Sequence, residues 1–147
     1  MKPETIAIHA PERRRDGAVA PPIHLSTTFE HGPGNESLHG REYRRDSNPN
    51  VDDLEHRLAA LEGGVGAVAF GSGMAAGAAL MQSLPRGATI VFHRDLYFAF
   101  RKLATTILPE QGVRARFVDL GDADGLGAAV AGADLVWFET PSNPRLE

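Results

Sequence analysis

The stretch from residue 67 to residue 84 carries the clearest chemical signal in this 147-residue sequence. A short apolar run stops at Gly71, Ser72 and Gly73, and a block rich in Ala, Leu and Met begins at Met74. This order predicts a strand, a tight turn and a buried helix whose first backbone N–H groups have no partner inside the helix. Such N–H groups bind anions, so a phosphate is the expected ligand, and the Ser72 hydroxyl can add a donor. The alternative is a plain strand-to-helix connection that binds nothing.

Polar side chains also follow two later apolar runs. Tyr97 comes shortly after the run at residues 88–92, and Glu139 and Asn143 come after the run at residues 135–138. A tyrosine ring can stack on a planar ligand, an amide can donate to a ring oxygen, and a carboxylate adds a charged group. Each residue also has a structural alternative, since Tyr97 could pack over the sheet and Ser-Asn-Pro at 142–144 is a common turn signature.

A polar loop at residues 40–50 contains three arginines and one tyrosine. Arginine forms bidentate hydrogen bonds with phosphate or carboxylate groups, and the Tyr43 hydroxyl can add another donor. The loop could therefore complete an anion site. A solvated loop without a ligand is the alternative.

These clusters need a scaffold that brings them together. Periodicity predicts helices at about residues 50–62, 74–84, 98–108 and 125–131, and strands at 65–70, 88–92, 115–118 and 135–138. Strands that alternate with helices indicate an α/β fold with a mostly parallel sheet. Ligands of such sheets bind outside the carboxyl ends of the strands, so the clusters that follow strands are expected to form one site.

The first part of the chain has weak periodicity and many prolines. The elements expected there are a helix at residues 4–9, an edge strand or extended contact at 23–29, and an N-cap at Asn50 or Asp52. We expect residues 1–62 to form an arm and a first helix that lie on another part of the protein or on a partner subunit. Residues 63–147 are expected to form the first part of the α/β domain.

The composition argues against nucleic-acid and membrane partners. Fifteen Lys and Arg stand against nineteen Asp and Glu, which gives a formal net charge of −4, and no basic stripe occurs. The sequence has no cysteine, so it holds neither a disulfide nor a thiolate metal site, and its six histidines lack metal-type spacing. No apolar run reaches the length of a membrane span and no signal-peptide pattern occurs, so we expect a cytoplasmic protein.

Short motifs along the chain resemble the pyridoxal-phosphate-dependent enzymes of cysteine and methionine metabolism. This trans-sulfuration family includes cystathionine γ-synthase, cystathionine γ- and β-lyases, methionine γ-lyase and O-acylhomoserine sulfhydrylases. The matching motifs are Ile8-His9-Ala10, Pro21-Pro22-Ile23-His24, Tyr43-Arg44-Arg45, Asn48-Pro49, Leu61-Glu62-Gly63-Gly64, Ser72-Gly73-Met74, Asp95-Leu96-Tyr97 and Glu139-Thr140-Pro141-Ser142-Asn143-Pro144. So many collinear matches are specific. They imply the first part of the type I, aspartate aminotransferase-like fold.

The resemblance implies a site for pyridoxal 5′-phosphate. By position, the backbone amides of Gly73 and Met74 would hold the cofactor phosphate, next to Ser72. The family's counterparts of Tyr43 and Arg45 reach the phosphate bound by the neighbouring subunit. The resemblance therefore implies a homodimer, or a tetramer built from dimers.

The same resemblance assigns residues to the cofactor ring and the substrate. Tyr97 would be the catalytic residue that stacks on the pyridine ring and helps to deprotonate the incoming amino group. Asn143 would bond the phenolic oxygen of the cofactor, and Glu139 would lie near the substrate. The implied reaction of the family is a β- or γ-elimination or replacement on a small sulfur amino acid.

Two departures from the family pattern stand out. Phe98-Ala99-Phe100 replaces the small Gly-Gly-Thr/Ser that commonly follows the tyrosine. We expect this bulk to affect which substrate binds more than whether the cofactor binds. The family's cofactor-binding lysine has no match among these residues, whose only lysines are Lys2 and Lys102. We therefore expect the chain to be inactive alone.

Two alternative functions fit parts of the sequence. Residues 71–76 fit the G-x-G-x-x-A pattern of a dinucleotide-binding module, with Asp95 about 20 residues further on. That function leaves residues 43–50 and 139–144 unexplained. The other alternative is a non-catalytic protein that pairs with a full-length homologue.

Overall fold

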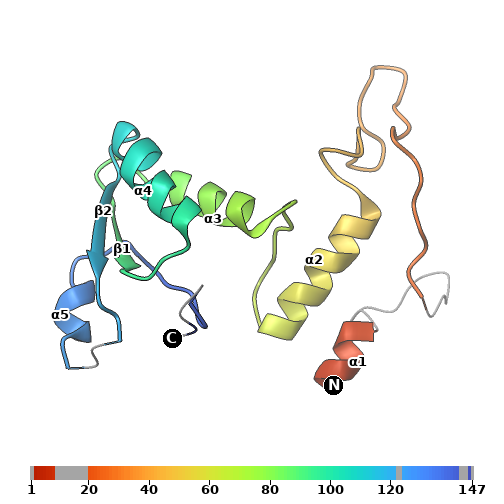
Figure 1. Cartoon of the computed structure of the whole chain (residues 1–147). Coiled ribbons are helices and arrows are strands. Elements are labelled where there is room, and N and C mark those ends of the chain that lie inside the picture. Colours follow the sequence, from red (N-terminus) through yellow and green to blue (C-terminus); the bar gives the residue numbers. More distant parts are fainter. Residues whose placement is uncertain (1, 9–19, 122–123, 143–145, 147) are drawn as a thin grey trace. The chain divides into compact units, whose positions relative to one another are not determined.

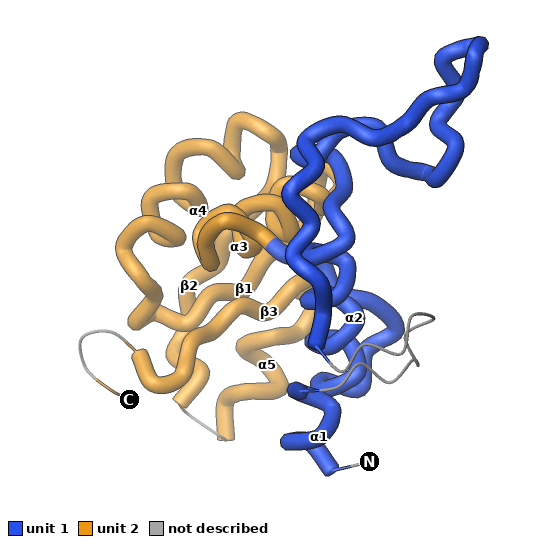
Figure 2. Tube along the Cα trace, turned by 90° about the vertical axis from the view of Figure 1, so that its right-hand side faces the viewer, with its two compact units in different colours: residues 1–69 blue, residues 70–147 orange. Residues whose placement is uncertain are grey.

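The computed structural model describes residues 2–8, 20–121, 124–142 and 146. Its elements are α1 (Pro3–Ile8), α2 (Pro49–Glu62), α3 (Gly73–Gln82), β1 (Thr89–His93), α4 (Phe98–Glu110), β2 (Arg114–Val118), α5 (Leu126–Val130) and β3 (Leu135–Trp137) (Figure 1). They form two compact units, residues 1–69 and 70–147 (Figure 2). The expected boundary after residue 62 falls inside the first unit, and the assignment of that part to a subunit contact stays a prediction. Among the described helices, none has the length and apolar character needed to cross a membrane.

The second unit is built on a three-stranded parallel sheet in the order β2-β1-β3. Phe92 in the central strand pairs with Phe117 on one side and Trp137 on the other. Helices α3 and α4 pack on one face of this sheet, where Met81 and Leu108 are fully buried with Phe92. Each such side chain contributes about 1.5–3 kcal/mol when buried. The predicted α/β fold with a mostly parallel sheet is therefore confirmed.

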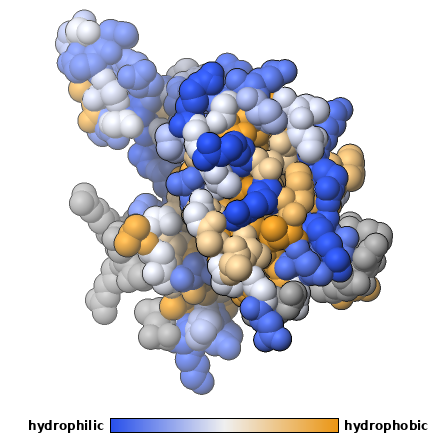
Figure 3. Space-filling view, turned by 90° about the vertical axis from the view of Figure 1, so that its left-hand side faces the viewer, coloured by the Kyte–Doolittle hydropathy of each residue, from blue (hydrophilic) through white to orange (hydrophobic). Residues whose placement is uncertain are grey.

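Helix α5 packs beside the opposite face of the sheet. Helix α5, the loop before α5, strand β3 and the residue after β3 line an open apolar pocket of about 280 Å³, formed by Leu120, Leu126, Val130, Val136 and Phe138. Alternate residues of a strand face opposite sides, so Leu135 and Trp137 face the core while Val136 faces this pocket. Figure 3 shows apolar surface between hydrophilic side chains on one face of the molecule. Within the described residues, β2 and β3 each have one unpaired edge.

The strand expected at residues 65–70 is absent, and this prediction was wrong. The segment is extended but forms no ladder within the described part of the chain. Val65 and Val68 are exposed rather than buried. A strand needs a neighbour that accepts and donates backbone hydrogen bonds, and no described strand lies beside this segment. Instead, the Ala69 N–H donates to Glu55 Oε1 of α2 at 2.7 Å.

The predicted N-cap of α2 was wrong, because the cap is Asn48, two residues before Asn50. The Asn48 side chain accepts from the Asn50 N–H at 2.9 Å. Pro49 occupies the first helical position, where its fixed φ suits a helix and its missing N–H costs nothing. The end of the helix is as predicted, at Gly63 in the left-handed conformation with φ 66°.

The segment at residues 23–29 is an extended contact rather than a regular strand. Thr28 and Tyr43 form an isolated antiparallel bridge. The Asn50 side chain fixes the start of the segment, since its Nδ2 donates to the Pro22 carbonyl at 2.7 Å and its Oδ1 accepts from the His24 N–H at 2.9 Å. The loop that contains Tyr43 therefore contacts the arm at Thr28, and the arm contacts α2 at Asn50.

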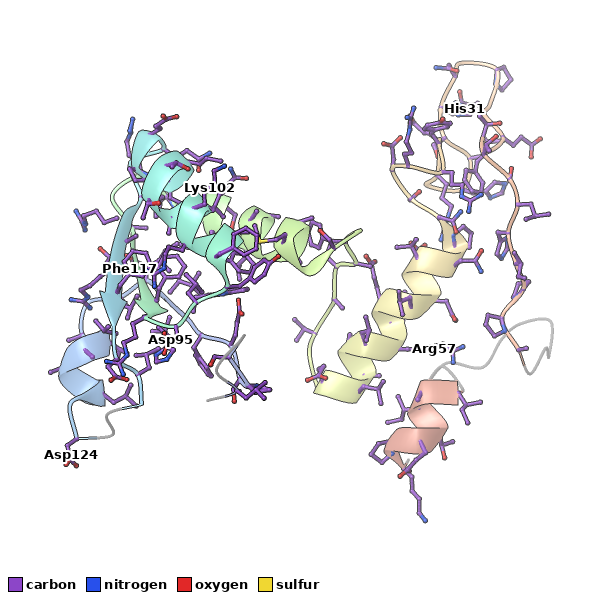
Figure 4. All side chains as sticks on the ribbon, viewed as in Figure 1. His31, Arg57, Asp95, Lys102, Phe117 and Asp124 are labelled. Carbon is purple, nitrogen blue, oxygen red and sulfur yellow. The ribbon has the colours of Figure 1, made fainter. Side chains whose placement is uncertain are left out.

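Arg57 connects α2 to the short helix α1 (Figure 4). Helix α1 was predicted from the sequence. Its last expected residue, His9, lies outside the described residues. The Arg57 Nε donates to Asp53 at 2.9 Å, and its Nη1 donates to the carbonyls of Ala7, at 3.2 Å, and Ile8. These carbonyls belong to the last turn of α1, where no intrahelical donor reaches them.

Replacing Arg57 by alanine is expected to release α1 without unfolding the second unit. The loss of charge-assisted bonds to two carbonyls should raise the amide exchange rates of residues 4–8 by roughly tenfold. Hydrogen exchange read by mass spectrometry measures this effect. Arg44→Ala, which removes an exposed arginine of the same unit, is the control. Equal exchange in both variants would contradict the assignment.

Candidate functional site

The N-terminus of α3 presents free backbone donors. Ser72 is the N-cap, in an extended conformation with φ −162° and ψ 157°, and its Oγ accepts from the Ala75 N–H at 3.1 Å. The first backbone bond of the helix runs from the Ala76 N–H to the Ser72 carbonyl. Among the described hydrogen bonds, the N–H groups of Gly73 and Met74 therefore have no acceptor. The helix begins at Gly73, one residue before the expected start.

This terminus has the properties that a phosphate site requires. The Ser72 oxygen accepts a bond from inside the helix, so its hydroxyl proton is left to donate outward. A Cβ built on Gly71 or Gly73 would meet no heavy atom within 4 Å, so the surface beside the donors is open. The helix is ten residues long, and its dipole places partial positive charge at the same point. The residues present thus fit a phosphate group.

Tyr97 follows β1 and occupies the N-cap position of α4. It is half-buried, and its ring centroid lies 4.7 Å from that of Phe98 and 6.4 Å from that of Phe100. Met74 at the start of α3 and Tyr97 both pack against the core cluster of the second unit. The open donors and the tyrosine therefore belong to the same compact unit.

Glu139 lies two residues beyond the end of β3 and is half-buried. Because β3 pairs in parallel with β1, Glu139 and Tyr97 follow the carboxyl ends of neighbouring strands. This is the edge of the sheet at which the sequence placed them. Asn143, the remaining residue expected there, lies outside the described residues.

Tyr43 and Arg45 belong to the first unit. The Arg45 guanidinium lies over the Tyr43 ring, 4.8 Å from its centroid. The Tyr43 carbonyl accepts from the N–H groups of Asp46 and Ser47, which closes the turn just before α2. The two side chains are thus presented together. Their contact with a phosphate stays a prediction.

The two phenylalanines of the unusual Phe98-Ala99-Phe100 segment have different surroundings. Phe100 is 5% exposed and its ring lies 5.0 Å from that of Trp137, while Phe98 is 71% exposed. Positions two residues apart on a helix differ by about 200° in direction, so one ring faces the core and the other faces away. The bulk of Phe100 serves the core, which the sequence alone did not reveal.

Sequence comparison matches nearly the whole chain to one family. The model of the family described as "Cys/Met metabolism PLP-dependent enzyme" matches residues 4–147. Cystathionine gamma-lyase of Bos taurus is 40% identical over 148 residues, which cover 97% of this chain and 36% of the relative. The chain therefore spans little more than a third of the length of that relative.

Structural comparison gives the same result. The structure of metB from Corynebacterium glutamicum has a TM-score of 0.84 and 37% identity, covering 100% of this chain and 39% of that one. Apo CalE6, a methionine gamma lyase from Micromonospora echinospora, has a TM-score of 0.80 and 39% identity, covering 99% of this chain and 40% of that one. These matches favour a pyridoxal phosphate site over the dinucleotide-binding alternative.

Proposed function

The chain belongs to the family of PLP-dependent enzymes of cysteine and methionine metabolism, and from this premise we propose that it binds the phosphate of pyridoxal 5′-phosphate at the N-terminus of α3. The observation that carries the proposal is the pair of open N–H groups at Gly73 and Met74 beside the Ser72 hydroxyl. When bound, this cofactor draws electrons from the α-carbon of an amino acid. The proposed reaction of the whole protein is a β- or γ-elimination or replacement on a small sulfur amino acid.

The second group of donors comes from the loop before α2. We assign Tyr43 and Arg45 to the phosphate bound by a second copy of the chain, where the hydroxyl and guanidinium would each donate. Arg45 already lies against the Tyr43 ring, so the pair needs little further ordering to bind. A homodimer, or a tetramer of dimers, is the proposed assembly. Pairing with a full-length homologue would use the same surface.

The residues at the carboxyl edge of the sheet complete the proposed site. The Tyr97 ring would stack on the pyridine ring, and its phenolic oxygen would take a proton from the substrate amino group. Asn143 would donate to the phenolic oxygen of the cofactor, and Glu139 would lie beside the substrate. The proposed location is the cytoplasm, where free sulfur amino acids are available.

A binding titration with the purified chain tests this proposal. The probe is pyridoxamine 5′-phosphate, which lacks the aldehyde and so cannot react with surface amines such as Lys102 of α4 (Figure 4). We expect the fluorescence of the probe to report saturable binding that inorganic phosphate competes away. Pyridoxamine without its phosphate and NADH should bind far more weakly. Equal binding of pyridoxamine, or preferential binding of NADH, would contradict the proposal.

The chain alone is expected to show no turnover. Its lysines are Lys2 and Lys102, and Lys102 lies on the exposed side of α4 (Figure 4). Without a lysine at the cofactor, no group can hold it covalently and move the α-proton. The assay mixes the chain with pyridoxal 5′-phosphate and cystathionine and measures 2-oxo acid and ammonia. Release above the rate of free pyridoxal 5′-phosphate would disprove this prediction.

A further inference from the structure

Phe98 is an exposed aromatic side chain at the carboxyl edge of the sheet. It is the first residue of α4 and leaves 71% of its surface open. Its ring centroid lies 4.7 Å from that of Tyr97, with an angle of 57° between the two planes. The two rings lie side by side at the start of α4, in the segment that follows β1.

The core does not require an aromatic ring at this position. Phe100 fills the space between α3, α4 and β3, where it meets Trp137. Phe98 is not part of that buried cluster. A large apolar group that stays in water gives up the stabilisation that burial would supply. Burial in the core therefore does not account for this ring, and its position beside Tyr97 makes it available to a ligand.

The neighbours of Phe98 indicate which part of a ligand it would meet. Tyr97 is the residue proposed to stack on the cofactor ring, and Glu139 follows the adjacent strand. If Tyr97 stacks on the cofactor ring as proposed, the exposed Phe98 beside it borders the space for the side chain of a bound amino acid. This step rests on the proposed function.

We propose that Phe98 is a specificity-determining residue, whose ring forms an apolar wall against the side chain of the substrate amino acid. A thioether or alkyl side chain can pack on the ring, and sulfur in particular makes favourable contacts with aromatic edges. A side chain that ends in a second ammonium and carboxylate group loses water there without gaining a charged partner from the ring. The wall therefore favours methionine-like substrates over cystathionine-like ones.

Two stable conjugates test this assignment on the chain itself. The probes are N-(5′-phosphopyridoxyl)-L-methionine and N-(5′-phosphopyridoxyl)-L-cystathionine, the second joined through the amino group of the four-carbon half. They carry the same cofactor part and differ only beyond the thioether sulfur. Titrations that follow the fluorescence of the pyridoxyl group give both dissociation constants. We expect the methionine conjugate to bind about tenfold more tightly. Both conjugates carry the thioether sulfur, so the difference comes from the distal ammonium and carboxylate of cystathionine, which lose water against the ring.

Phe98→Ala is the decisive variant. Without the ring, the charged end of the cystathionine side chain keeps its water, so the preference should fall to within about twofold while the affinity for pyridoxamine 5′-phosphate stays the same. Ile107→Ala removes a partly exposed apolar side chain further along α4 and should leave the preference intact. A preference that is absent, or that survives in Phe98→Ala, overturns this inference alone. Failure of the unmodified chain to bind pyridoxamine 5′-phosphate overturns the proposed function and this inference with it.

Discussion

Replacing Gly73 by proline is expected to weaken the binding of pyridoxamine 5′-phosphate by about 10- to 100-fold. Proline has no N–H, so the variant loses one of the two open donors at the start of α3. A hydrogen bond to a charged group contributes about 1.5–3 kcal/mol, which corresponds to that range of affinity. The measurement is the fluorescence titration with pyridoxamine 5′-phosphate.

The fold should tolerate this proline, so a loss of affinity in the variant can be assigned to the missing N–H. Gly73 is the first residue of the helix after the N-cap, the position at which proline is favoured. Proline also restricts the preceding residue to extended backbone, and Ser72 already has φ −162° and ψ 157°. A Cβ added at Gly73 meets no heavy atom within 4 Å, so the first carbon of the proline side chain has room.

Gly73→Ala is the matched control. It adds a Cβ in the same open space but keeps the N–H, so its affinity should stay within about twofold of the original chain. If alanine and proline weaken binding equally, bulk rather than the lost donor is responsible. If neither weakens binding, the phosphate lies elsewhere and the proposed site is wrong.

The sequence predicted best those elements whose signals are local. Gly71, Ser72 and Gly73 followed by a long Ala-rich block are enough to start a helix, and the structure places that start within one residue of the expected one. The parallel strands β1 and β3 were recognisable as short apolar runs, whereas β2 alternates arginine with apolar residues. Tyr97 and Glu139 could be placed at one edge because parallel strands end together.

The predictions that failed depended on distant partners or on competition between neighbours. Residues 65–70 have the composition of a strand, but pairing is a property of two segments, and no described segment pairs with them. Asn48, Asn50 and Asp52 are all good caps in isolation. The proline after Asn48 decided between them, since it fixes the first helical position.

The role of Gly77 could not be predicted from the sequence, because it depends on a contact between two helices. Gly77 lies inside α3 and is buried. A Cβ built on it would lie 2.4 Å from Phe100 Cζ and 3.1 Å from a ring carbon of Trp137. The missing side chain is what allows the Phe100 ring of α4 to pack against α3. The bulky residue that departs from the family pattern is thus matched by a glycine on the facing helix.

Gly77→Ala is therefore expected to destabilise the second unit, although alanine is the better helix former. Helix propensity alone would favour alanine by about 0.5–1 kcal/mol. Against this, a contact of 2.4 Å forces the Phe100 ring to move, and the ring is 5% exposed with Trp137 beside it. Overpacking of a core costs about 1–3 kcal/mol, which exceeds the gain in propensity. The melting temperature, followed by the fluorescence of Trp137, the single tryptophan, should fall by several degrees.

Two further variants separate the clash from a general effect of alanine. Gly127→Ala places the same methyl group in α5, where a Cβ meets no atom within 4 Å, so the melting temperature should stay equal or rise. Phe100→Leu removes the ring carbons that Gly77→Ala would strike, so the cost of Gly77→Ala should shrink in that background. A coupling of about 0.5–3 kcal/mol between the two positions is expected for residues in direct contact. Equal costs of Gly77→Ala in both backgrounds would mean that the loss of stability arises elsewhere than at Phe100.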